Sequence, residues 1–294
     1  MKMRILAILL FAVQIGFGQI YIDSYRFAEA APLEVEYLVV AGGGGAGGTE
    51  TTFGGGGWYG GGGGAGGLLT GNINTLQAGV NYNVSVGLGG TGGVSSGSPT
   101  PGQNGQNSVF EAFTAIGGGG GGGGLNSSNK NGSSGGSGGG GGSNYNASDP
   151  IGGSGTTGQG NNGGNGSGAN LGHSGSGGGA GGSGNNAVAV CAGGVGLTID
   201  ITGVNVTYST GGDGGNNSVL GSNGAANTGD GGDRGNAMTI GNGHSGGSGV
   251  VILRYPSTYT ITNPGGGLTF DPPITVGSDK VTIFTAGTGN IQFN

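Results

Sequence analysis

The sequence predicts an all-β protein in which glycine-rich left-handed helices of the polyglycine-II type form a bundle framed by β-strands. Three observations support this fold class. Glycine supplies 87 of the 294 residues, against a usual share of about 7%. Charged residues make up 7% of the chain, which is not the composition of a charge-rich disordered chain. The glycine runs, of which Gly117–Gly124 is the longest, alternate with apolar segments that have strand-like patterns.

The run Gly117–Gly124 could be a flexible linker or an ordered element. Glycine has the largest backbone entropy of any residue, so an isolated run behaves as a linker. The alternative is a polyproline-II-type helix, which makes no internal hydrogen bonds and rises about 3.1 Å per residue. Its amides must then bond to neighbouring segments, because buried donors and acceptors do not stay unpaired. An ordered run therefore needs other glycine tracts and a core that holds them together.

Apolar segments between the glycine tracts supply that core. Val35–Val40 predicts a strand, and Val80–Val86 alternates apolar with polar residues. Gln106–Ile116 is a further apolar segment that enters the eight-glycine run. Leu197–Tyr208 predicts a hairpin, and Gly249–Pro256 predicts a closing strand. A linker needs no such strands, so the pattern favours an ordered bundle.

Within the bundle we expect Gly117–Gly124 to be the central helix, with shorter tracts broken by Ser, Asn or Asp around it. The aspartates Asp213, Asp230 and Asp233 are then expected to face solvent. On this layering, Gly120→Val unfolds the domain, whereas a Gly→Ser change within 132–142 is mild.

The chain divides into four parts. Lys2 and Arg4 precede the apolar stretch Ile5–Val13, and Gly16 and Gly18 offer small residues before a cleavage point at Gln19, which is the pattern of a secretory signal peptide. No later segment reaches the roughly 18 apolar residues of a membrane span, and no α-helix is expected beyond the signal peptide. The predicted parts are a signal peptide (1–18), a lead-in linker (19–34), the glycine-rich domain (35–256) and a small β-rich C-terminal tail (257–294). Within the tail we expect short strands at Tyr259–Thr262, Leu268–Phe270, Ile274–Val276, Lys280–Thr285 and Ile291–Phe293.

Residues for catalysis or metal binding are scarce. The only histidines are His173 and His244, and the only cysteine is Cys191, so no zinc-ligand spacing occurs. Between Tyr37 and Leu253 the only basic residues are Lys130 and Arg234, which argues against a nucleic-acid surface. We therefore expect no enzyme activity, no catalytic residue, no metal and no cofactor.

Binding is the better candidate function. Trp58 and Tyr59 lie between glycine tracts where no strand pattern includes them. Exposed aromatic side chains stack on sugar rings or anchor interfaces, although these two could also pack as a lid on the bundle. Polar inserts add uncharged donors and acceptors that suit glycans. The candidate ligand-binding residues are Trp58, Tyr59, Asn126, Asn144 and Tyr145.

The sequence resembles the glycine-rich domain family found in bacterial secreted proteins and phage tail adhesins. The resemblance covers roughly 35–256 and is carried by Tyr37–Gly45, Gly62–Gly67, Tyr82–Gly87, Thr114–Gly119, Ile201–Gly203, Ala226–Gly229 and Gly246–Tyr255. It implies packed polyglycine-II helices joined to β-strands, with loops at the distal end of the bundle that recognise bacterial surface receptors. Because this chain has its own predicted signal peptide, we do not expect it at a phage tail tip.

The expected function is that of a secreted, non-enzymatic adhesion or recognition module of a bacterium, located outside the cell or on its surface. Its partner would be a surface glycan or protein, with no nucleic acid involved. A structural component of an extracellular matrix or filament, formed by self-association, is the alternative. Ice binding is a third, for which the sequence lacks a regular Thr or Ala ladder.

Overall fold

The computed structural model describes residues 33–50, 58–125, 127–145, 148–168, 172–187, 190–215, 221–235 and 241–294. The chain divides into two units, Met1–Ala31 and Pro32–Asn294, and the described residues all belong to the second. The predicted signal peptide and the lead-in linker up to residue 32 lie outside the described residues.

The described residues form an all-β structure that contains no helix, and so none that could cross a membrane. One large antiparallel sheet has the strand order β2-β1-β10-β14-β3-β4-β5, and its two end strands β2 and β5 contact each other. The strands on this path are β1 (Val35–Val40), β2 (Leu68–Ile73), β3 (Tyr82–Val86), β4 (Ser108–Phe110), β5 (Phe113–Ala115), β10 (Val250–Pro256) and β14 (Asp279–Phe293). Shorter strands are β6 (Val190–Cys191), β7 (Leu197–Ile199), β8 (Val206–Tyr208), β9 (Gly214–Gly215), β11 (Ile261–Thr262), β12 (Leu268–Phe270) and β13 (Ile274–Val276).

Alternation along the strands builds a core on each face of the sheet. In β1, Val35, Tyr37 and Val39 pack into the larger cluster together with aromatic residues of β3, β4 and β14. Leu38 and Val40 point to the opposite face and pack with residues of β10 and of the β7–β8 hairpin. The predicted hairpin is confirmed, with its turn at 201–204.

Strand β2 is not apparent in the sequence. Its segment Leu68–Ile73 contains Gly71 and polar residues, and its only fully buried side chain is Leu68. The tertiary structure explains the glycine: a Cβ there would lie 3.0 Å from the Tyr37 hydroxyl. Similarly, the apolar segment 106–116 is divided into β4 and β5 by a turn in which Glu111 has a φ of 52°.

The residues after 256 are part of the main sheet. Strand β14 pairs with β10 through residues 279–284 and with β3 through residues 287–291. Its side chains Phe284, Ile291 and Phe293 are fully buried in the larger cluster. The glycine-rich part and the C-terminal tail expected from the sequence therefore share one core.

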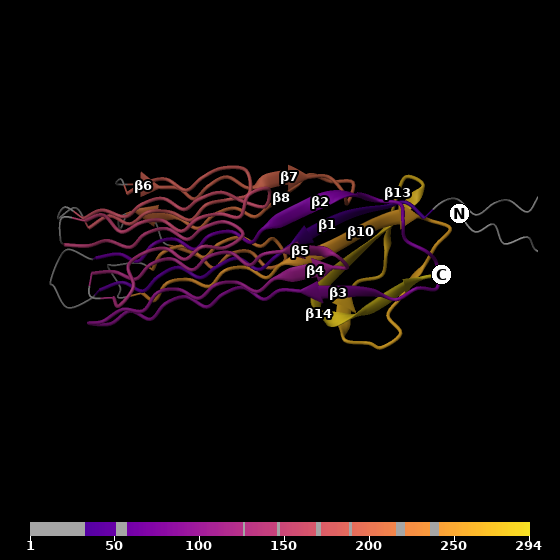
Figure 1. The fold of residues 1–294 in the computed structure, drawn as a ribbon, viewed down its shortest axis with the longest axis horizontal. Helices are drawn as coiled ribbons and strands as arrows, with labels where there is room; N and C mark the ends of the chain where they lie inside the picture. The colour runs from indigo at the N-terminus through magenta and orange to yellow at the C-terminus, as the bar shows by residue number, and fades with distance from the viewer. Residues whose placement is uncertain are drawn as a thin grey trace, which may run out of the picture. The chain divides into compact units, whose positions relative to one another are not determined.

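The glycine-rich segments between the strands run side by side away from the sheet (Figure 1). They are cross-linked by backbone hydrogen bonds that follow a three-residue repeat. Successive N–H groups of 41–48 donate to three different segments and return to the first after three residues: Gly44 donates to Gly64, Gly45 to Gln103, Ala46 to His244 and Gly47 to Gly61, with N···O distances of 2.8–2.9 Å. Segment 41–48 also accepts hydrogen bonds from three more segments, 87–94, 117–124 and 229–235.

The interior of this array differs from the predicted layering. Four segments form backbone hydrogen bonds with neighbouring segments on all sides: 41–48, 58–67, 137–144 and 174–179. The run Gly117–Gly124 is buried, but it lies at the edge of the array, since the N–H groups of Gly117 and Gly120 donate to the side-chain oxygens of Asn107 and Asn104. The expectation that this run is the central segment is wrong.

Close approach of backbones explains why glycine is required here. A Cβ on Gly44 would lie 2.2 Å from the Gly119 carbonyl oxygen, and one on Gly120 would lie 2.1 Å from that of Gly102. Gly138, in a region where substitution was expected to be mild, would place its Cβ 1.9 Å from the Gly153 oxygen. Substitution of a glycine within 132–142 is therefore expected to be as disruptive as substitution in the eight-glycine run.

Asparagine and aspartate side chains complete the hydrogen bonding at the edge of the array. Their Oδ atoms accept from backbone N–H groups of adjacent segments, in the place that the carbonyl of a further segment would occupy. Asp213 accepts from Gly193, Asp230 from Thr210 and Asp233 from Asp213, each at 2.8–2.9 Å. The expectation that these three aspartates simply face solvent is wrong, because each is half-buried and bonds to a neighbouring segment.

Burial of two of these carboxyls makes the stability of the array depend on pH. Desolvation raises the pKa of Asp230 and Asp213 above the model-compound value of 3.8, although backbone hydrogen bonds from Thr210 and Gly193 oppose the rise. At a pH between the unfolded and the folded pKa of each carboxyl, the folded state therefore binds more protons than the unfolded state. The contribution of the protonated carboxyls to the stability of the folded state is fully present below the unfolded pKa and is lost as the pH rises through the folded pKa.

Asp230→Asn is expected to stabilise the domain at neutral pH by up to about 1 kcal/mol. The amide keeps the acceptor for the Thr210 N–H group but carries no charge to desolvate. The gain should shrink as the pH falls through the raised pKa of this carboxyl, because the parent protein then also carries a neutral group there. Urea denaturation across this pH range measures it, with the exposed Asp271→Asn as control. A gain independent of pH would contradict the electrostatic cause.

Candidate functional site

The glycine-rich segments bring three of the candidate binding residues together at the end of the array that lies away from the sheet. Segment 41–50 leaves β1 and segment 58–67 returns to β2, and a bridge between Glu50 and Trp58 pairs their far ends. The Tyr59 carbonyl accepts the Ser143 N–H group at 2.8 Å. This contact places residues 144 and 145 next to Trp58.

Trp58 and Tyr145 form an aromatic pair. Their ring centroids lie 5.7 Å apart with an interplanar angle of 72°, an edge-to-face arrangement. Tyr145 is 60% exposed and Trp58 is half-buried. Asn144 donates its backbone N–H to the Ser167 carbonyl and its side-chain amide to the Ser148 carbonyl. We call Trp58, Asn144 and Tyr145 the tip cluster.

Tyr59 lies beneath the surface and supports the tip cluster. Its side chain is 5% exposed, and the Arg234 guanidinium carbon lies 5.2 Å from the ring centroid, a cation–π geometry. Burial raises the pKa of the Tyr59 hydroxyl, and the charge of Arg234 partly offsets the rise. Of the two adjacent aromatics, Trp58 is therefore the one available to a ligand.

Arg234 is a buried residue of this region that the sequence analysis did not single out. It is 4% exposed, and its Nε donates to the Gly214 carbonyl at 2.9 Å. Desolvation lowers its pKa, which the phenol of Tyr59 and the carboxylates of Asp213 and Asp233 oppose. The feature of the sequence that could have indicated a role for Arg234 is that it is a single arginine in a glycine tract almost free of basic residues.

The remaining candidate, Asn126, lies outside the described residues. So do residues 51–57, 146–147 and 216–220. The structure therefore places four of the five candidates: three form the tip cluster, and Tyr59 lies below it.

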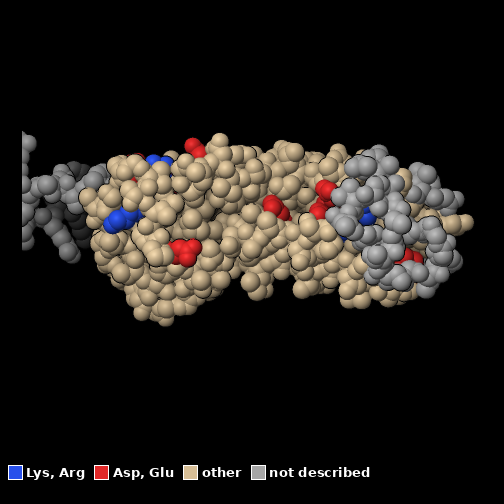
Figure 2. Space-filling model, turned by 180° about the vertical axis from the view of Figure 1, so that it is seen from behind, with Lys and Arg blue, Asp and Glu red and all other residues tan. Residues whose placement is uncertain are grey.

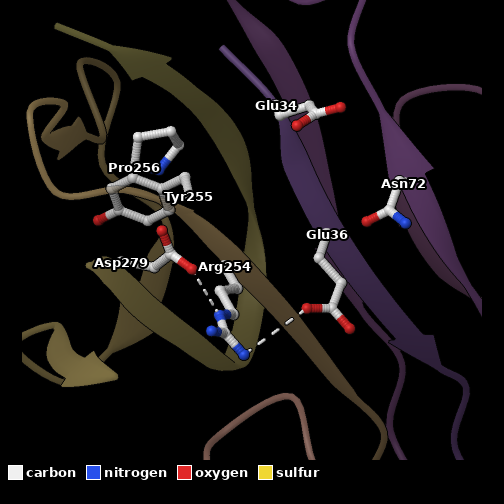
Figure 3. A pocket seen from close by; sticks show the side chains of 7 residues that line it. All are labelled: Glu34, Glu36, Asn72, Arg254, Tyr255, Pro256 and Asp279. Atoms are coloured by element: carbon white, nitrogen blue, oxygen red, sulfur yellow. Dashed lines mark hydrogen bonds and ion pairs between the residues drawn. The ribbon is translucent and has the colours of Figure 1, made fainter. Parts of the chain in front are cut away.

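A separate pocket of about 370 Å³ lies at the sheet end of the unit. Figure 3 shows Arg254 between two carboxylates, with its Nε 2.9 Å from Asp279 Oδ2 and its Nη1 4.0 Å from Glu36 Oε2. Glu34 and Asn72 line the opposite wall. Because the side chains of this ion-pair network are partly exposed to solvent, it contributes little to stability.

Charge is sparse over the glycine-rich segments. The face shown in Figure 2 carries few acidic or basic side chains, and most of its surface comes from other residues. Within the described ranges, no group of three or more His, Cys, Asp or Glu residues lies close enough to hold a metal ion. The chemistry offered at the tip cluster is thus that of aromatic rings and amides.

A search of curated proteins finds none that is similar. The pattern of the glycine-rich domain matches residues 24–256, which is most of the chain and includes every glycine-rich segment described above. The chain belongs to the glycine-rich domain family.

Proposed function

We propose that this protein is a non-enzymatic recognition module that binds a surface ligand, such as a carbohydrate, through the far end of its glycine-rich array. The observation that carries the proposal is the tip cluster, an aromatic pair with an adjacent amide at the end of a closely bonded scaffold. Aromatic rings stack on the apolar faces of sugars, and amides bond to their hydroxyls.

We further propose that the array is a polyglycine-II bundle. The three-residue repeat in hydrogen-bond partners supports it, because a polyproline-II-type helix has three residues per turn and presents its amides to three neighbours. The closest approaches between segments also support it, since a Cβ on Gly44 or Gly120 would lie only 2.2 or 2.1 Å from a carbonyl oxygen of a neighbouring segment.

The side-chain caps at the edge favour a finite module over a self-extending filament. Asn104 illustrates this, because its Oδ1 accepts from Gly120 while its Nδ2 donates to the Ser134 carbonyl at 3.3 Å. One side-chain amide thus takes the place of a peptide group from a further segment. A matrix or filament would instead need open rows of donors and acceptors at its sides, as exposed sheet edges provide.

Export is part of the proposal, and the basic and apolar pattern of residues 1–18 supports it. The protein would then act outside a bacterial cell or on its surface. The mature chain would begin at Gln19, and mass spectrometry of the secreted protein would detect any other start.

Trp58→Ala is expected to reduce binding of the purified protein to its glycan, identified on a glycan array, by at least about tenfold, which corresponds to about 1.4 kcal/mol. The lost contact is an aromatic stacking surface of the size that dominates binding hot spots. Leu88→Ala is the matched control, since Leu88 is an exposed apolar residue on the glycine-rich array away from the tip cluster.

The same experiment distinguishes the alternatives. Absence of binding by the parent protein, together with spontaneous filament formation, would favour a structural role. Equal binding by parent and Trp58→Ala would remove the tip cluster as the site.

A further inference from the structure

The array contains a chemically fragile dipeptide in repeated form. Asn-Gly is the sequence most prone to deamidation, because the small glycine lets its backbone nitrogen reach the asparagine side chain. That nitrogen attacks Cγ, the new Cγ–N bond closes a succinimide, and ammonia leaves. Water then opens the ring to aspartate or to isoaspartate, whose backbone contains an extra methylene. The chain holds six such pairs, beginning at Asn104, Asn131, Asn162, Asn165, Asn223 and Asn242.

In the folded protein both reacting groups of every pair are bonded elsewhere. Each asparagine Oδ1 accepts a hydrogen bond from another segment: Asn104 from Gly120, Asn131 from Ile151, Asn162 from Gly155, Asn165 from Gly152, Asn223 from Ser245 and Asn242 from Ser95, at 2.8–3.0 Å. Each glycine N–H donates to a backbone carbonyl: Gly105 to Gly118, Gly132 to Ile151, Gly163 to Gly153, Gly166 to Pro150, Gly224 to Ser245 and Gly243 to Gly93, at 2.8–2.9 Å.

These two bonds oppose the reaction directly. The attacking nitrogen must lose its proton and turn towards Cγ, but that proton is held by a carbonyl of another segment. The side chain must rotate towards its own backbone, but its oxygen is held by a different N–H group. Either movement needs local opening of the array, so deamidation becomes limited by the free energy of opening.

We infer that the hydrogen-bonded array protects all six Asn-Gly pairs from deamidation, and that deamidation of the opened chain makes unfolding irreversible. The second part follows from the three-residue repeat. An isoaspartate lengthens the backbone within a segment, so the residues after it no longer face their partners. The protection does not depend on what the tip cluster binds.

Peptide mapping by mass spectrometry tests the inference on the full chain. The protein is incubated in mildly alkaline buffer with and without urea, and asparagine loss is followed at each pair. We expect loss at the six pairs to be at least about tenfold slower in the folded protein, because even about 1.4 kcal/mol of opening free energy lowers the open population tenfold.

Pro264→Asn provides the internal control. It places an asparagine directly before Gly265, in an exposed turn where nothing lies within 4 Å of the glycine Cβ position and the described residues show no bond to its N–H group. This engineered pair should deamidate at a similar rate with and without urea. Natural pairs that deamidate in the folded protein as fast as the engineered pair would overturn the inference.

Refolding tests the second part. After incubation in urea, the protein is diluted into buffer and its native circular dichroism is measured. The fraction of this signal that returns should fall with incubation time, as the isoaspartate content at the six pairs rises. Full recovery from a sample rich in isoaspartate would refute irreversibility.

Discussion

Gly44→Ala is expected to destabilise the protein by about 3 kcal/mol or more, the upper range for overpacking a closely packed interior. The added Cβ would lie 2.2 Å from the Gly119 carbonyl oxygen, and Gly44 belongs to a segment bonded on all sides. The segment cannot move aside, because its hydrogen bonds to six neighbours would break together. Urea denaturation of the purified variant measures the loss.

Gly265→Ala is the matched control. Its Cβ would meet nothing within 4 Å and the glycine is exposed, so the expected change is within about 0.5 kcal/mol. Gly138→Ser should resemble Gly44→Ala, because its Cβ would lie 1.9 Å from the Gly153 oxygen. Equal stability of Gly44→Ala and Gly265→Ala would mean that the segments are not as close as described.

Phe284→Ala is expected to cost about 3–5 kcal/mol, the usual range for removal of a buried aromatic side chain. Phe284 is fully buried in the larger core cluster, and its strand β14 pairs with both β10 and β3. Loss of this ring would leave a cavity beneath the sheet from which the glycine-rich segments emerge. Thermal and urea unfolding should both record the loss.

Ile274→Ala tests whether this effect belongs to the core or to the tail in general. Ile274 lies in β13 of the same C-terminal part but is 44% exposed, so the expected cost is below about 1 kcal/mol. If Phe284→Ala disrupted only the C-terminal strands, and the glycine-rich segments kept the stability that they have in the parent protein, the tail would be a separate domain.

The strands and the hairpin were accessible to sequence analysis because apolar alternation is a local signal. Strands β1, β12 and β13 were expected with the observed bounds. Strand β14 was expected as two short strands, Lys280–Thr285 and Ile291–Phe293, but forms one of 15 residues. Its middle contains Gly287 and Gly289, which interrupt the apolar pattern; only the pairing with β3 shows that the strand continues.

The candidate site was accessible in part. Trp58 and Tyr145 stand out as aromatics among glycines, yet nothing in the sequence indicates that residues so far apart touch. Tyr59 adjoins Trp58 in the chain, but its ring packs against Arg234, whereas the Trp58 ring packs against Tyr145. A lone arginine can be buried only where carbonyl groups of other segments accept its hydrogen bonds. No local sequence pattern predicts which segments supply these carbonyls.

The sequence by itself determined the all-β class, the alternation that builds the sheet, and the need for ordered glycine tracts to find neighbours. The tertiary structure alone decided which segments are neighbours, which of them are central, and which residues complete the edge. The physical reason is that glycine has no side chain. Its tracts carry no hydrophobic periodicity, and their order comes from backbone hydrogen bonds between residues distant in the chain. The same hydrogen-bond pattern explains the asparagines and aspartates at the edge of the array. Where no further segment supplies a carbonyl, their side-chain oxygens accept the hydrogen bond of the backbone N–H group.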